Sequence, residues 1–407
     1  MRILMVTPLY PPVMIGGAEL AVQNMTRGLM AQGHEVFVVA LQQPRAKAEP
    51  DETSTSQVKR IPLANVYWPF ATQTQSRSLL ARACWHLIDT SNPVMADRLE
   101  QHVREVNPDI ICTHNLQGFS TGILPALAKS PARKVHVLHD CSLLCLKGAL
   151  FRNGKRCDGK GKQRRCLGCA GLTRMRRHHL EHIDLVVGVS QAIIDIHKRY
   201  GLFTDTPCQV VHNSVRVDLE PILAAEVGHA DRPFTFGFLG RVEAPKGAGT
   251  LAAAATMLTT EPINIVAAGT GSSAYMAKLA SQAPDLQFTG HTDPKAFFDK
   301  VDALVMPSAS FEAFSGVIVE AFSQAKPVIA TRCGGPEELV THGETGYLVP
   351  RDDPSALAAA MRCMAGLSPN QYLAMADAAR HQAANFCLRS QSQRLSKLFT
   401  GLLAQRR

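Results

Sequence analysis

Short apolar runs alternate with stretches of helical periodicity along most of the chain. Five runs in the first half have the length and composition of buried strands, at residues 3–6, 36–41, 109–113, 134–138 and 185–189. A second series of six follows at residues 234–239, 264–268, 286–289, 303–306, 327–330 and 346–349. Helical patterns fill the gaps, including residues 19–32, 249–258, 314–324 and 355–365. This alternation predicts an α/β protein with parallel sheets.

The same pattern divides the chain into two domains. Residues 42–56 and 219–231 have loop or linker composition, and the second stretch separates the two series of strands. We therefore expect a Rossmann-like domain at residues 1–218 and a second at residues 219–385, both doubly wound and facing a cleft. A chain of 407 residues accommodates two such domains. In such sheets, ligands bind beyond the carboxyl ends of the strands.

Composition limits the class of protein. Hydrophobic residues make up 46% of the chain and charged residues 19%, which excludes wholesale disorder. No apolar run approaches the ~18–20 residues of a membrane span. The N-terminus reads as a strand followed by prolines rather than as a signal peptide. We therefore expect a cytoplasmic protein, with a peripheral position on the inner face of the cell membrane as a further option.

The net charge of +9 is concentrated in one segment. Between Arg152 and Arg177 there are ten basic residues and a single acid, Asp158. Such a patch suits an anionic membrane surface, a phosphorylated acceptor or a nucleic acid, whereas a solvated loop is the alternative.

Four of the eleven cysteines lie within this basic segment or just before it. They follow the spacing C-x11-C-x8-C-x2-C within an insertion at residues 141–177, and they are Cys145, Cys157, Cys166 and Cys169. Four thiolates can hold a structural zinc ion, with Cys141, His178, His179 and His182 as substitute ligands. Free thiols in a loop are the alternative. A redox pair at the C-x2-C step is less favoured, because the thioredoxin-like context is missing.

Two loops have the composition of phosphate sites. Gly16 and Gly17 open a helix directly after the first strand, where free N–H groups and the absence of side chains suit an anion. Neither a G-x-G-x-x-G nor a P-loop spacing is present, so an empty Gly-Gly turn is the alternative. Arg241 and Lys246 straddle a turn beyond the strand at residues 234–239. The forked guanidinium of arginine and the compact ammonium of lysine, placed in this way, suit the two phosphates of a diphosphate.

The segment at residues 306–321 carries the most specific signal. A loop with Glu312 leads to the start of a helix at Phe314, Ser315 and Gly316, whose free N–H groups form a second anion site. Glu320 follows one helical turn after Gly316, where a carboxylate can bind paired ribose hydroxyls. Two solvated acids are the alternative. For Glu320 this is disfavoured, because its neighbours are apolar and a buried acid needs a partner.

These motifs together resemble one enzyme family. Glu312 and Glu320 match the E-x7-E motif of retaining, nucleotide-sugar-dependent glycosyltransferases of family 4, which have the GT-B fold. The motifs at residues 16–19, 240–247, 268–271 and 333–337 look like that family's motifs, in its order. The resemblance covers most of residues 1–385 and implies a C-terminal helix, at residues 386–407, that crosses back to the first domain. The His-Asp-x4-Cys sequence starting at His139 resembles a Cys-rich subset from bacterial surface-polysaccharide assembly.

The resemblance also implies roles for individual residues. Catalytic roles would fall to His139, Arg241, Lys246 and Glu312. Donor binding would involve Gly16, Gly17, Arg241, Lys246, Gly269, Glu312, Phe314, Ser315, Gly316 and Glu320. Displacement would occur from the front side with retention, the leaving phosphate accepting the acceptor's proton, and no metal would be needed for the chemistry.

The expected reaction moves a hexosyl-type sugar from a nucleotide-diphosphate sugar to a lipid-linked or polysaccharide acceptor, such as a lipid diphosphate. The basic insertion would dock onto anionic lipid or onto that acceptor. A sugar-nucleotide epimerase or a phosphorylase of the same fold is one alternative. A nucleic-acid-binding protein is another, but it predicts aromatic residues among the basic ones, and residues 152–177 contain none. We expect no nucleic-acid partner.

Overall fold

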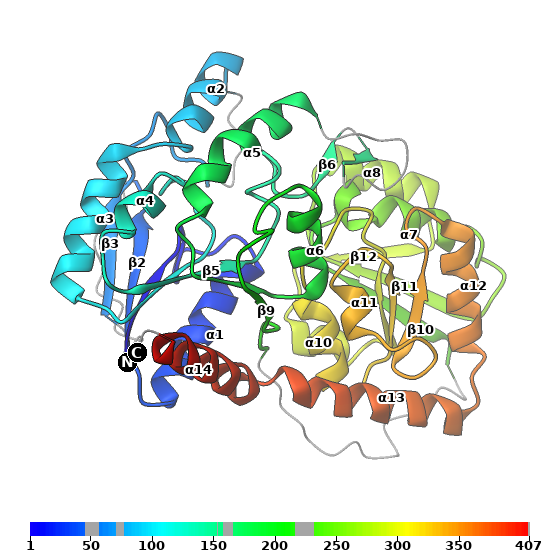
Figure 1. Cartoon of the computed structure of the whole chain (residues 1–407). Coiled ribbons are helices and arrows are strands. Elements are labelled where there is room, and N and C mark those ends of the chain that lie inside the picture. Colours follow the sequence, from blue (N-terminus) through cyan, green and yellow to red (C-terminus); the bar gives the residue numbers. More distant parts are fainter. Residues whose placement is uncertain (45–56, 71–76, 153, 158–165, 216–231, 406–407) are drawn as a thin grey trace. The chain divides into compact units, whose positions relative to one another are not determined.

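The computed structural model describes residues 1–44, 57–70, 77–152, 154–157, 166–215 and 232–405, which form two compact units (Figure 1). The first unit comprises Met1–Gly148, Arg164–Ser214 and Leu388–Arg407, and the second comprises Ala149–Gln163 and Val215–Cys387. The predicted domain boundary at 218/219 and the linker at residues 219–231 lie outside the described residues. The same holds for most of the linker predicted at residues 42–56.

The first unit is built on a seven-stranded sheet in the order β3-β2-β1-β4-β5-β8-β9, with every pair parallel. The strands are β1 (Arg2–Val6), β2 (Glu35–Gln42), β3 (Gln57–Pro62), β4 (Ile110–Thr113), β5 (Arg133–Leu138), β8 (Leu185–Gly188) and β9 (Cys208–Val210). The five predicted strands are confirmed. The two edge strands, β3 and β9, carry polar residues at half-exposed positions and were not predicted.

Helices cover both faces of this sheet. They are α1 (Gly17–Ala31), α2 (Leu79–Ile88), α3 (Pro93–Val106), α4 (Ile123–Leu127), α5 (Leu167–Leu180), α6 (Gln191–Arg199) and α14 (Leu388–Ala404). The C-terminal α14 packs against α1, so the chain returns to the first unit after completing the second. Gln391 of α14 fixes this return, because its side chain accepts from the Ser214 hydroxyl at 2.7 Å and donates to the His212 carbonyl at 3.0 Å.

The second unit repeats the plan with six parallel strands in the order β12-β11-β10-β13-β14-β15. The strands are β10 (Phe234–Leu239), β11 (Ile263–Ala268), β12 (Leu286–Gly290), β13 (Ala303–Met306), β14 (Val328–Thr331) and β15 (Gly346–Val349). All six were predicted, because strands buried on both faces read as continuous apolar runs.

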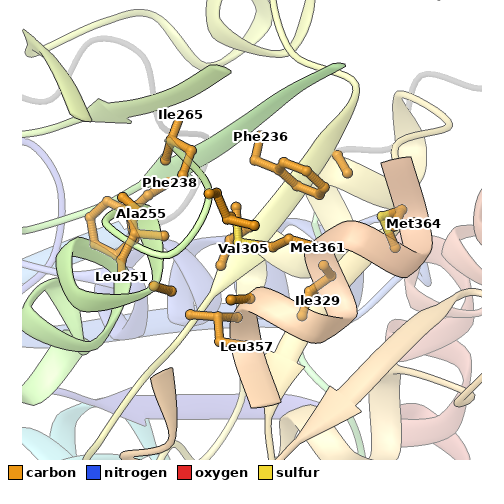
Figure 2. Packing of buried hydrophobic residues seen from close by; sticks show 14 of the residues in the cluster. Phe236, Phe238, Leu251, Ala255, Ile265, Val305, Ile329, Leu357, Met361 and Met364 are labelled. Atoms are coloured by element: carbon orange, nitrogen blue, oxygen red, sulfur yellow. The ribbon is translucent and has the colours of Figure 1, made fainter. Parts of the chain in front are cut away.

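The core of the second unit lies between this sheet and its helices. The helical elements are η2 (Ala244–Lys246), α7 (Ala248–Ala255), α8 (Ser273–Gln282), α9 (Pro294–Phe298), α10 (Gly316–Ser323), α11 (Pro336–Leu339), α12 (Pro354–Ala365), α13 (Pro369–Ala383) and η3 (Ala384–Phe386). Figure 2 shows Phe236 and Val305 of the sheet packed against Met361 of α12, and Phe238 against Leu251 of α7. Burying each of these side chains contributes roughly 1.5–3 kcal/mol.

Both sheets are doubly wound, and the strand order reverses between β1 and β4 in one and between β10 and β13 in the other. The loops that follow β10, β13 and β14 therefore meet at one edge of the second sheet. No helix within the described ranges is long and apolar enough to cross a membrane.

The predicted insertion at residues 141–177 is divided between the two units. Its helix α5 belongs to the first unit, whereas the hairpin of β6 (Phe151–Arg152) and β7 (Lys155–Arg156) belongs to the second. Arg156 of the hairpin forms an ion pair with Asp352, 3.6 Å apart, in the second unit.

Candidate active site

An ion pair joins the loops that follow β10 and β13. Lys246, the last residue of η2, donates from Nζ to Glu312 Oε1 over 2.7 Å. The Ser308 hydroxyl donates to the same oxygen over 2.9 Å. Both charged side chains are partly buried, so the two predicted site residues are held in a fixed geometry rather than left in solvent.

Backbone contacts lock these loops together. The N–H groups of Ala309 and Ser310 both donate to the Pro245 carbonyl over 3.0 Å. Gly247 has φ +76°, and a Cβ there would lie 1.8 Å from the Pro307 carbonyl oxygen, so only glycine allows this approach. Glu312 donates its N–H to Cys333 O over 2.9 Å, which adds the loop after β14.

Glu320 lies against the N-terminus of α10. Its Oε1 is 4.0 Å from the position that a Cβ on Gly316 would occupy, so the carboxylate lies back over the first turn of the helix. In the described part of the chain this carboxylate has no hydrogen-bond or ion-pair partner, and burial raises its pKa. A half-buried acid without a partner is costly unless a ligand supplies donors.

Two further predicted residues, Phe314 and Ser315, lie directly before the first residue of α10. Ser315 is the N-cap, but its side chain makes no capping hydrogen bond to the helix N–H groups. Phe314 packs edge-on to Phe386, with ring centroids 6.1 Å apart, and this contact anchors the turn. With the α10 N-terminus uncapped and Glu320 beside it, the segment offers donors and an acceptor side by side.

Arg241 and Gly269 have other contacts. The side chain of Arg241 is 65% exposed, and its guanidinium forms an ion pair with Glu243 over 3.2 Å. The Gly269 N–H donates to Gly290 O over 2.7 Å, and a Cβ on Gly269 would lie 1.8 Å from Gly240 O. Gly269 therefore lets the loops after β10 and β11 pack closely.

In the first unit, Gly16 and Gly17 start α1. The Glu19 side chain accepts the Gly16 N–H at 2.9 Å, and Gly16 has no side chain that could cap the helix in return. A Cβ on Gly17 would find no atom within 4 Å, and neither glycine has a positive φ. Within the described residues of this unit, no contact or backbone angle demands glycine at position 17, and a ligand contact there stays a prediction.

His139 forms a pair that the sequence reasoning missed. It follows β5, and its Nε2 shares a hydrogen bond of 2.9 Å with Nδ1 of His114, which follows the neighbouring β4. Both rings are buried, and the outer nitrogens, His139 Nδ1 and His114 Nε2, have no partner in the described residues. Burial lowers the pKa of His139 to about 4 and that of His114 well below its usual value. Both imidazoles are therefore neutral at pH 7: one ring donates its N–H in the hydrogen bond between them, and the other ring carries its N–H on the outer nitrogen.

The next residue, Asp140, organises the loop that follows. Its carboxylate accepts from Ser142 N at 2.7 Å and from Asn115 Nδ2 at 3.0 Å. The signal for His114 and Asn115 was present in the sequence, because they follow the predicted strand at residues 109–113. The carboxyl ends of adjacent parallel strands meet, so these residues lie near His139 and Asp140.

Three of the four clustered cysteines lie together in the first unit. The thiol of Cys169 is hydrogen-bonded to the thiols of Cys145 and Cys166, and these contacts with burial raise its pKa. Cys157 belongs to the second unit, where its N–H donates to Leu150 O over 2.6 Å. Across the described ranges, no group of three or more His, Cys, Asp or Glu side chains is arranged to hold a metal ion. Zinc binding by these cysteines stays a prediction.

A buried ion pair fixes α5, and the sequence reasoning missed it too. Arg176 donates to Asp89, the C-cap of α2, over 3.0 Å and to the Ser142 carbonyl over 2.9 Å. Burial raises the pKa of Asp89 to about 7, against the opposing effect of the guanidinium. One basic residue of the patch is therefore structural.

Comparison with known proteins shows the family of this chain. The family model "Glycosyltransferase Family 4" matches residues 15–219, and "Glycosyl transferases group 1" matches residues 233–366. The "Uncharacterized 42.6 kDa protein in cps region" of Klebsiella pneumoniae is 30% identical over 342 residues, which cover 83% of this chain and 87% of that protein. The chain belongs to glycosyltransferase family 4.

Further relatives of this glycosyltransferase carry more specific names. The "Lipopolysaccharide core biosynthesis mannosyltransferase LpcC" of Rhizobium leguminosarum bv. viciae is 28% identical over 252 residues, covering 57% of this chain and 70% of that protein. The solved structure "Anabaena Alr3699/HepE in complex with UDP-glucose" superposes with a TM-score of 0.69 at 19% identity. The match covers 98% of this chain and 100% of that chain. At this identity the likeness shows the fold, which is the predicted GT-B fold.

Proposed function

We propose that this glycosyltransferase moves a hexosyl-type sugar, with retention, from a nucleotide-diphosphate sugar to a lipid-linked or polysaccharide acceptor. One observation carries the proposal. The Lys246–Glu312 pair joins the loops at the carboxyl ends of β10 and β13, and Glu320, which has no partner among the described residues, lies on α10 beside the start of that helix. A cation, helix N–H groups and a carboxylate in this order match a diphosphate followed by a ribose.

Each group has a defined role in the proposal. Glu320 accepts hydrogen bonds from the ribose hydroxyls, which supply the donors that its buried carboxylate lacks. Lys246 and the N-terminus of α10 bind the diphosphate. Donor binding exchanges the exposed Arg241–Glu243 pair for an Arg241–phosphate contact. Glu312, held by Lys246 and Ser308, accepts from the sugar hydroxyls.

We assign Gly17 and His139 of the first unit the roles that the family resemblance implies, namely backbone contact with the diphosphate and a hydrogen bond to the transferred sugar. A neutral imidazole suits the second role, because it binds a hydroxyl without adding charge. Since His114 occupies one ring nitrogen of His139, His114 decides whether the other nitrogen donates or accepts.

The chemistry follows from charge stabilisation. As the glycosidic bond breaks, negative charge gathers on the leaving diphosphate, where Lys246, Arg241 and the helix terminus lower its energy. The same phosphate accepts the proton of the attacking acceptor hydroxyl on the front face, so the configuration is retained. The proposal assigns no step to a metal ion or another cofactor.

The proposed acceptor class rests on the name of one relative. The name of the Rhizobium relative places that protein in lipopolysaccharide core biosynthesis, and we extend a related acceptor class to this chain. An enzyme of this kind would act at the inner face of the cell membrane without crossing it.

The test is release of nucleotide diphosphate from a panel of nucleotide-hexoses, with and without lipid-diphosphate sugars, and proton NMR of the product. We expect acceptor-dependent release and the same anomeric configuration in donor and product. Lys246→Met should lower kcat/KM by about 100-fold, since a removed charge-stabilising contact costs about 10²–10³ in rate. The control is Lys278→Met, an exposed lysine on α8 of the same unit. An inverted product would overturn retention, and donor isomerisation without acceptor would instead indicate an epimerase.

A further inference from the structure

Three aromatic residues gather in the loop that follows β3, the edge strand of the first sheet. Tyr67, Trp68 and Phe70 fill three of four consecutive positions, in a chain with only 6% aromatic residues. Their side chains are half-buried, and the rings of Trp68 and Phe70 pack edge-to-face with centroids 5.2 Å apart. In the described part of the chain, the indole N–H of Trp68 has no hydrogen-bond partner. This ring therefore keeps both surface and a donor available for a ligand.

The aromatic loop, residues 63–70, is held in place although it contains no helix or strand. Asn92 Nδ2 donates to the Ala64 carbonyl over 2.6 Å. The buried Trp85 of α2 donates from Nε1 to the Tyr67 carbonyl over 3.1 Å, and the centroids of these two rings are 6.0 Å apart. A loop that is already fixed in one conformation loses little entropy when it binds a ligand.

The aromatic loop borders other loops at the carboxyl edge of the first sheet. It leaves the carboxyl end of β3, and these ends share one edge in a parallel sheet. On β3, Arg60 donates from Nη2 to the Pro11 carbonyl over 2.7 Å, in the loop before α1. Leu63 Cδ1 lies 3.2 Å from the position of a Cβ on Gly118, in the loop after β4 that begins with His114. The aromatic loop therefore belongs to the same edge as the predicted site residues of this unit.

We propose that Trp68 and Phe70 form a stacking platform for one sugar ring of an oligosaccharide acceptor. A pyranose ring has a face of C–H groups and a rim of hydroxyls. The C–H face packs on the electron-rich face of an aromatic ring, and a hydroxyl accepts the indole N–H. An apolar lipid chain would leave this N–H without an acceptor, so a saccharide fits the platform better.

This inference rests on the proposed function and names its acceptor more closely. In the sheet, β3 is four strand spacings from β5, the strand before His139, which is about 19 Å at roughly 4.8 Å for each spacing. A ring on the platform is therefore a different sugar from the one that reacts near His139. The acceptor is then an oligosaccharide rather than a single sugar.

The experiment measures saccharide binding by the full chain without a sugar donor. Wild type is tested on an array of bacterial surface oligosaccharides, with the constituent monosaccharides beside them. We expect binding to an oligosaccharide and weaker binding to its monosaccharides. Trp68→Ala should bind at least about tenfold more weakly, the loss expected when an aromatic residue at a binding hot spot is truncated. Trp68→Phe keeps an aromatic ring and loses the N–H, so it should lose less affinity.

Tryptophan fluorescence locates the bound saccharide, because the sequence contains only two tryptophans. Trp85 is buried and its N–H is already paired, so a change in emission on binding should come from Trp68. This change should be absent in Trp68→Phe, although that variant still binds. If Trp68→Ala fails to fold, the fluorescence of wild type and Trp68→Phe decides the question, and an unaltered change in Trp68→Phe overturns the proposal.

The matched control is Val66→Ala, which shortens an exposed side chain in the same loop and should bind saccharide as wild type does. Glu320→Gln should also keep wild-type saccharide affinity, and Trp68→Ala should keep wild-type nucleotide affinity, so the platform and the donor site can fail separately. Equal saccharide binding by wild type and Trp68→Ala overturns the proposal, as does the absence of any bound saccharide. Loss of lipid-vesicle binding in Trp68→Ala, without a change in saccharide affinity, would overturn it in favour of a lipid partner.

Discussion

Gly247 offers a sharp test of how the candidate site is held. Its φ is +76°, and a Cβ at this position would lie 1.8 Å from Pro307 O. Alanine at position 247 therefore costs stability twice, once through its backbone conformation and once through the clash with this carbonyl. Gly290 provides the matched control, because its φ is +71° and a Cβ there finds no atom within 4 Å. Gly290→Ala therefore isolates the backbone penalty in the same unit.

The magnitudes follow from these contacts. Placing alanine in the left-handed region costs about 1–2 kcal/mol in both variants. In Gly247→Ala the loop after β13 also has to move away, which strains the two hydrogen bonds from Ala309 and Ser310 to Pro245. At about 1 kcal/mol for each bond, the total reaches about 3–4 kcal/mol. The movement also separates Lys246 from Glu312.

Urea unfolding followed by circular dichroism, together with nucleotide titration, measures both effects. We expect Gly247→Ala to lose about 2 kcal/mol more stability than Gly290→Ala, by the hydrogen-bond contributions above, and to bind nucleotide at least about tenfold more weakly. Equal stability and equal affinity in the two variants would refute the packing of these two loops.

Three further outcomes test other parts of the molecule. The pKa of His139 is about 4 in the folded protein against 6.5 for a free imidazole, so the folded state loses stability as pH falls below about 6.5. Between pH 7.5 and 5 the free energy of unfolding should fall by about 2 kcal/mol on this account. In urea unfolding, His139→Gln should show a smaller dependence of stability on pH. Arg176→Met leaves the Asp89 carboxyl buried without its cation and should destabilise by about 3–5 kcal/mol, with partial recovery on adding Asp89→Asn; a neutral single variant would contradict this. Gly17→Ala should unfold like wild type but bind nucleotide at least about tenfold more weakly, since its Cβ meets only open space until a ligand arrives; unchanged affinity would remove Gly17 from the site.

The interior of the fold was predictable from the sequence, and its edges were not. Strands such as β4 and β13 are buried on both faces, so each is a continuous apolar run. β3 lies at the sheet edge, where its exposed Gln57 and Lys59 break that run.

In the candidate site, residue types were predictable but pairings were not. Lys246 and Glu312 are 66 positions apart, and only the strand order β10-β13 brings their loops together. Arg241 carries the charge expected of it, yet it pairs locally with Glu243. His114 was missed because strand order, not spacing, places it beside His139.

Nucleotide binding tests the central claim most directly. The measurement is a thermal-unfolding titration of wild type and Glu320→Gln with UDP and with GDP, supported by calorimetry. At 100 times its dissociation constant, a bound nucleotide adds about 2.7 kcal/mol to the free energy of unfolding. We predict stabilisation of wild type by one nucleotide and at least about tenfold weaker binding by the variant, which should be as stable as wild type without ligand. Equal affinity in both proteins, or no stabilisation by either nucleotide, would contradict a donor site at Glu320.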